Sequence, residues 1–145
     1  MPYFTDLAPW TYLGAETAKQ LVAVGWIDRL HGFEQNAVPE DVLAKLDQSP
    51  EPRASISFLG IHECSLCQFS KTLTGYVVPS DGFLYVYPAL LLHFIREHGY
   101  APPTVFCEAV RNAPPFNSIE YLRLVKHHGP RGMFDHLAIA DREDA

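Results

Sequence analysis

The sequence of 145 residues contains only three cysteines, and this excludes the disulfide framework that stabilises many small secreted proteins. It has no uninterrupted apolar run of about 18 residues, so no membrane-spanning helix is expected. The first ten residues show no basic segment followed by an apolar one, so no secretory signal is expected. These absences together predict a cytoplasmic protein.

Basic residues are also scarce. Lysine and arginine number 11 against 17 aspartates and glutamates, which gives a formal net charge of −6. No segment forms the basic stripe that duplex-binding proteins normally carry. Nucleic acid is therefore disfavoured as a partner, whereas a protein partner is compatible with the sequence.

The composition is that of a folded chain, with 48% hydrophobic and 19% charged residues. The length predicts a single domain over residues 1–145. Apolar periodicity and the turn residues predict a small α+β fold, with a β-hairpin and short strands packed against three to four helices around a zinc-knuckle-like site. The expected strands are 20–27, 54–60, 74–78 and 82–87, and the expected helices are 39–47, 88–98, 102–112 and 119–128.

The residues that could carry chemistry begin with His62, Cys64 and Cys67, directly after the strand expected at 54–60. Two thiolates in a Cys-x-x-Cys turn can bind one metal ion. His62 precedes Cys64 by two positions, so in extended backbone both side chains point to the same side. The following hairpin reverses the chain and brings the next helix, with His93, beside the turn. This order of strand, cysteine motif, hairpin and helix predicts a zinc site formed by His62, Cys64, Cys67 and His93.

His98, on the same helix, is the alternative ligand. His93 and His98 are five positions apart, or about 140° around a helix of 3.6 residues per turn. They could share an ion only if the last turn tightened or unwound, so His98 is a substitute for His62 or His93. Cys107 falls within an apolar helix pattern and is expected to pack in the core.

The sequence is compatible with three functions. The leading one is a structural zinc domain, closed by four protein ligands, that acts as a binding or adaptor module. The second is a metal-dependent hydrolase with an open zinc position and Glu63, Asp81 or His98 as its base. The third is a redox protein that uses Cys64 and Cys67 as a dithiol. The first leads because the sequence shows no partnered acid and base beyond the expected ligands.

Several segments share a pattern with known sequences: an MPYF-x-DL start, an H-x-C-x-x-C knuckle, and a helix with H-x4-H-G-Y-x-P-P. They are MPYFTDLAPWTYL, VGWIDRLHGF, GIHECSLC and LYVYPALLLHFIREHGYAPPTVFCEAV. In these segments the chain resembles a family of small uncharacterised bacterial proteins with no known activity. The resemblance implies a family-like core at 1–112 and a helical C-terminal extension at 113–145. It groups the candidate ligands and implies no reaction.

Overall fold

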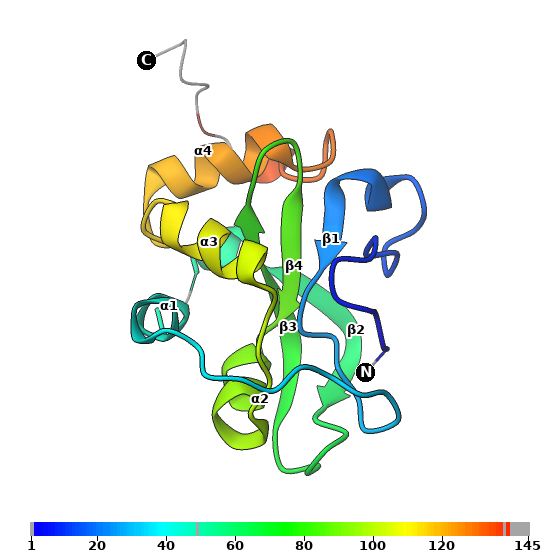
Figure 1. The fold of residues 1–145 in the computed structure, drawn as a ribbon. Coiled ribbons are helices and arrows are strands. Elements are labelled where there is room, and N and C mark those ends of the chain that lie inside the picture. Colours follow the sequence, from blue (N-terminus) through cyan, green and yellow to red (C-terminus); the bar gives the residue numbers. More distant parts are fainter. Residues whose placement is uncertain (1, 49, 138, 140–145) are drawn as a thin grey trace.

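The computed structural model describes residues 2–48, 50–137 and 139, and its elements are labelled in Figure 1. The strands in these residues are β1 (Leu21–Ala23), β2 (Ile56–Glu63), β3 (Lys71–Pro79) and β4 (Leu84–Pro88). The α-helices are α1 (Glu40–Leu46), α2 (Leu91–His98), α3 (Thr104–Asn112) and α4 (Ile119–His128). Short 3-10 turns lie at Thr17–Gln20, Pro52–Ala54 and Asp135–Leu137. The fold is α+β around one core, as the sequence predicted.

The strands form one mixed sheet in the order β1-β4-β3-β2. β3 and β4 make the expected antiparallel hairpin, whose turn is closed by the N–H of Ser80 donating to the carbonyl of Phe83 at 2.9 Å. β1 lies parallel to β4, with Leu21 opposite Leu84. The hairpin is therefore the centre of the sheet, and β2 occupies one edge.

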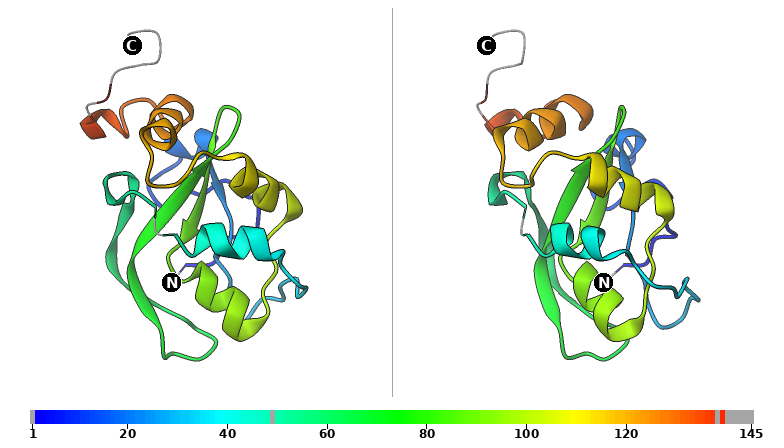
Figure 2. Two further views of the ribbon diagram at one scale, coloured as in Figure 1. Left: turned by 90° about the vertical axis from the view of Figure 1, so that its left-hand side faces the viewer. Right: turned by 60° about the vertical axis from the view of Figure 1, so that its left-hand side comes forward.

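β2 pairs with β3 in two registers. Ser57 lies opposite Thr74 and His62 opposite Thr72, so five steps along β2 correspond to two along β3. Extra residues of this kind bend a strand, and Figure 2 shows β2 curving along the edge of the sheet. The bend separates the regular start of β2 from its last residues, which lead into the cysteine loop.

The helices α1, α2 and α3 lie on one side of the sheet, and α4 lies across one end of it (Figures 1 and 2). α4 begins after Ser118, whose Oγ accepts the N–H of Tyr121 at 3.2 Å, as an N-cap should. α2 ends before Gly99, whose φ of 69° is the left-handed conformation expected at this position. The local stop and start signals in the sequence thus set these helix ends.

Residues 116–137, after the segment expected as the core, pack on the same hydrophobic core as the rest of the chain. The hydroxyl of Tyr121 donates to the carbonyl of Val77 in β3 at 2.7 Å, and both residues are fully buried. Gln20 Nε2 donates to the carbonyl of Gly129 at 3.3 Å, which ties the end of α4 to the residue before β1. No helix in the described part of the chain is long and apolar enough to cross a membrane.

Candidate metal centre

Both cysteines of the motif lie in the loop that joins β2 to β3. The N–H of Cys64 donates to the carbonyl of Ser70 at 2.9 Å, which extends the ladder by one step. The N–H of Gln68 donates to the carbonyl of Cys64 at 2.8 Å, and Gln68 has a positive φ of 65°. The backbone N–H groups of Leu66 and Cys67 lower the pKa of the Cys64 thiol. The loop is therefore a tight knuckle that holds both thiols on one turn.

Both histidines lie on α2, and the last turn of this helix is wider than an α-helical turn. The N–H of Gly99 donates to the carbonyl of Phe94, five residues earlier instead of four. The N–H of Tyr100 donates to the same carbonyl at 3.2 Å. These wide hydrogen bonds close the end of α2 just after His98. The Nε2 atoms of His93 and His98 lie 3.2 Å apart, so the two imidazoles face the same side.

The knuckle in the β2–β3 loop and the end of α2 bring four side chains together. The ligand atoms of Cys64, Cys67, His93 and His98 all lie within 4.8 Å of one another. Cys64 Sγ is 3.4 Å from His98 Nε2, and Cys67 Sγ is 3.3 Å from His93 Nε2. The two Nε2 atoms are 3.2 Å apart. Cys64 is fully buried and the other three are half-buried, so the group lies at the edge of the core.

These distances fit four ligands of one tetrahedral ion. With Zn–S bonds of about 2.3 Å and Zn–N bonds of about 2.05 Å, tetrahedral angles place S and N about 3.6 Å apart and N and N about 3.3 Å apart. The observed S···N separations of 3.3 and 3.4 Å and the N···N separation of 3.2 Å are close to these values. The Cys2His2 group could therefore hold a metal ion.

Ser70 supports the group from outside. Its Oγ lies 3.2 Å from His93 Nδ1. When Nδ1 carries the proton and donates to Ser70, Nε2 keeps its lone pair and can bind a metal. The carbonyl of the same residue also accepts the N–H of Cys64. Sequence reasoning missed Ser70, and its only signal was its place immediately before β3.

The electrostatics of the group favour the metal-binding protonation state of His93 but not that of Cys64. Burial raises the pKa of the Cys64 thiol, while the N–H groups of Cys67 and Leu66 lower it. Burial also lowers the pKa of His93, and the neighbouring His98 acts in the same direction. A neutral imidazole is the form that binds a metal. Burial thus favours the binding form of His93, whereas the Cys64 thiolate depends on its N–H donors and on a cation.

His62 lies apart from this group, among aromatic rings. It is 6% exposed and stacks on Phe58, with ring centroids 4.1 Å apart and an interplanar angle of 14°. The rings of Tyr12 and Trp26 lie at 5.7 and 6.2 Å. Its Nδ1 has no hydrogen-bond partner among the described residues, and burial lowers its pKa.

The structure therefore brings together three of the four expected ligands, Cys64, Cys67 and His93, and adds His98 as the fourth. Cys107, the remaining cysteine, is buried on α3, as its apolar surroundings in the sequence indicated. Of the bases considered for a hydrolase, Glu63 forms an exposed ion pair with Lys71 at 3.7 Å. Asp81 belongs to a different part of the molecule.

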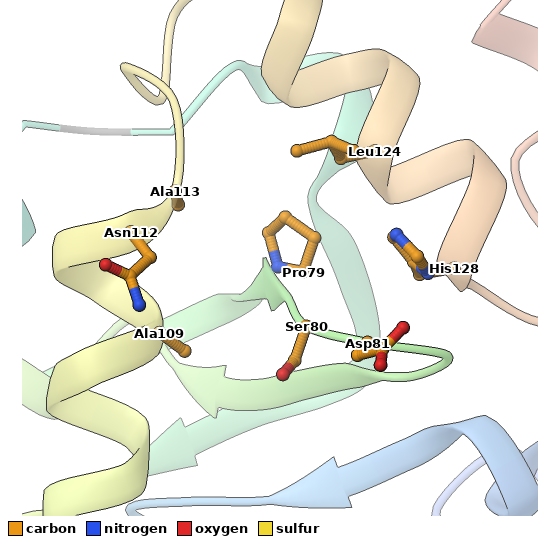
Figure 3. A pocket seen from close by; sticks show the side chains of 8 residues that line it. All are labelled: Pro79, Ser80, Asp81, Ala109, Asn112, Ala113, Leu124 and His128. Carbon is orange, nitrogen blue, oxygen red and sulfur yellow. The ribbon is translucent and has the colours of Figure 1, made fainter.

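Asp81 lines a cleft of about 300 Å³ at the far end of β3, between the hairpin turn and the helices α3 and α4 (Figure 3). Its polar lining groups come from Ser80, Asp81, Asn112 and His128. The Nδ1 of His128 accepts the N–H of Gly82 at 3.0 Å. No hydrogen bond joins Ser80, Asp81 and His128 in the described part of the chain, so the cleft has no aligned nucleophile and base. The Cys2His2 group remains the stronger candidate site.

Together these features define a small α+β domain with a Cys2His2 group between the β2–β3 loop and the end of α2. Residues 2–111 match the family described as a domain of unknown function, DUF7919, and the chain belongs to this family. This confirms the predicted resemblance to a family with no known activity. No curated protein and no solved structure matches the chain. The match includes all four members of the group and ends within α3.

Proposed function

We propose that this protein is a structural zinc-binding domain whose ion joins the β2–β3 loop to the end of α2. The observation that carries the proposal is the convergence of Cys64, Cys67, His93 and His98, from two segments, on a volume the size of one ion. Two thiolates and two imidazoles at tetrahedral spacing favour zinc over magnesium and calcium, which prefer oxygen ligands.

The number of protein ligands favours a structural site over a hydrolytic one. Structural zinc sites are closed by four protein ligands, whereas catalytic sites keep a fourth position for water. All four positions can be filled here by side chains. A hydrolase would require one of them, most readily the terminal His98, to leave the ion and act as the base.

A role as a binding module draws support from apolar side chains beside the site. Phe69 lies in the knuckle loop and is 91% exposed, and Ile61 on β2 and Leu73 on β3 are 63% and 53% exposed. Neighbouring exposed apolar side chains on a rigid frame are typical of protein-binding surfaces. An ion that fixes the loop would present Phe69 to a protein partner.

A reducing compartment suits this function. The three cysteines are free thiols, and Cys64 and Cys67 can bind a metal only while they are reduced. A cytoplasmic location fits this requirement. The segment after the family match then acts as an extension, of which α4 (Ile119–His128) packs on the core.

The decisive experiment is elemental analysis of the full chain purified under reducing conditions. We expect one zinc per chain, its loss in Cys64→Ser and His98→Ala, and its retention in Cys107→Ser, which removes a buried thiol outside the group. X-ray absorption should then show two sulfur and two nitrogen neighbours. A chain without metal would overturn the zinc site, and a bound water oxygen in place of one nitrogen would favour the hydrolase.

A further inference from the structure

The two sulfurs of the knuckle differ in their access to solvent. Cys64 is fully buried, whereas Cys67 is only half-buried at the surface of the loop. A small oxidant dissolved in water therefore reaches Cys67 first. Thiolate sulfur that is accessible is the form that reacts with peroxides, and metal binding keeps both sulfurs as thiolates.

The buried sulfur is placed to react with an oxidised Cys67. The two sulfurs lie on one knuckle turn, within 4.8 Å of each other. A disulfide needs a separation of about 2.05 Å, which rotation of the two side chains can supply within one turn. The third cysteine, Cys107, lies on α3 and is not a member of the group.

We propose that the knuckle is a modification site for hydrogen peroxide, at which Cys67 is oxidised, Cys64 forms a disulfide with it, and the zinc is released. This inference rests on the proposed zinc site. The Cys67 thiolate attacks one peroxide oxygen and the O–O bond breaks, which leaves a sulfenic acid and a hydroxide that takes up a proton. The Cys64 thiolate then attacks the Cys67 sulfur, the S–S bond forms, and the second hydroxide leaves and is protonated. Two electrons pass from sulfur to peroxide, two protons are consumed and two waters are formed.

Release of the ion follows from the loss of half its ligands. A disulfide sulfur is a poor zinc ligand, so only His93 and His98 remain, both on α2. The ion no longer joins the helix to the β2–β3 loop. Oxidation therefore frees the loop that carries Phe69, and reduction in the presence of zinc restores it.

The test treats the zinc-loaded full chain with hydrogen peroxide and follows zinc with a chromogenic chelator. We expect release of one zinc per chain together with a mass loss of about 2 Da in the peptide that contains both cysteines, one S–S bond having formed. Dithiothreitol and zinc should restore the original metal content. Cys107→Ser should release zinc at the same rate as the unmodified chain, because its thiol takes no part.

Three outcomes would overturn the inference: zinc retained in excess peroxide, a disulfide that includes Cys107, or zinc release with a mass gain from irreversible oxygen addition at Cys67 and no disulfide. The metal content before peroxide is added separates this failure from a failure of the zinc site itself. A chain that holds zinc and keeps it under peroxide contradicts only the present inference.

Discussion

The identity of the fourth ligand gives the sharpest prediction, because sequence reasoning preferred His62 and the structure places His98 in the group. We compare His98→Ala with His62→Phe. His98 Nε2 lies within 3.4 Å of Cys64 Sγ and 3.2 Å of His93 Nε2. His62 has no contact of this kind, and its ring stacks on Phe58. The first variant should lose metal affinity and the second should keep it.

The expected size follows from the number of ligands. Structural zinc sites bind with about 10–16 kcal/mol at neutral pH, so one ligand of four contributes about 2.5–4 kcal/mol. His98→Ala should therefore weaken zinc binding by roughly 10²–10³-fold. In His62→Phe, the removal of an unpaired buried nitrogen raises the free energy of unfolding by about 1–3 kcal/mol. The larger ring lowers it by a similar amount through overpacking, so the fold around the metal group should be kept. The zinc affinity of this variant should stay within about threefold.

Competition titration against a chromogenic chelator measures both affinities. Substitution of cobalt for zinc adds a second measurement, because the visible absorption of Co²⁺ reports its coordination number and its sulfur ligands. The reasoning fails if His62→Phe loses the metal while His98→Ala retains it. That result would mean that the knuckle and β2 rearrange on binding to the ligand set that the sequence first indicated.

Other parts of the structure give further predictions. Ser70→Ala should lower zinc affinity by about 10–100-fold, because His93 loses the partner that orients it; chelator competition measures the change, and Ser70→Thr, which keeps a hydroxyl, should restore most of it. Tyr121→Phe should lower the free energy of unfolding in urea by about 1 kcal/mol through loss of its buried hydrogen bond to Val77, and an unchanged stability would mean that α4 is not anchored there. Burial, with a further contribution from His127, lowers the pKa of His128 in the folded state. The contribution of neutral His128 to the free energy of unfolding is therefore complete above the unfolded-state pKa of about 6.5. It is lost as the pH falls through the lower pKa of the folded state. The difference in unfolding free energy between His128→Gln and the unmodified chain should therefore change in this acid range and be flat above it; a flat difference throughout would refute the assignment. Phe69→Asp should leave zinc content unchanged and alter stability by no more than about 0.5 kcal/mol, because the side chain is 91% exposed; a large loss of stability would show that Phe69 packs in solution.

The fold was largely predictable because its signals are local. The turn residues between the expected strands 74–78 and 82–87 predicted the hairpin. The expected helices 88–98 and 119–128 end and begin where the structure places Gly99 and Ser118. The parallel pairing of β1 with β4 was beyond such reasoning. It joins residues 21–23 to 84–86, and nothing within either segment specifies a partner so distant in the sequence.

The site was predictable to the level of its segments. The Cys-x-x-Cys turn predicted the knuckle, and the helix after the hairpin was expected to supply imidazoles. His62 was included because side chains two apart on a strand share a face, but the knuckle begins at Cys64, where the strand ends. Its surroundings are set by Tyr12 and Trp26, which are remote in the sequence. His98 could be placed only once the wide final turn of α2 was known.

The positions of the four candidate ligands along the chain have a consequence for folding if the proposed ion is bound. The contacts from Cys64 to His98 and from Cys67 to His93 span 34 and 26 residues, and the whole β3–β4 hairpin lies between them. A cross-link that closes a loop of this length lowers the conformational entropy of the unfolded chain. In the chain-entropy treatment used for disulfides, this raises the free energy of the unfolded chain by about 4 kcal/mol. An ion bound early would therefore bring knuckle and helix together before the remaining contacts form. The rate of folding, and not only the final stability, should rise with the concentration of zinc.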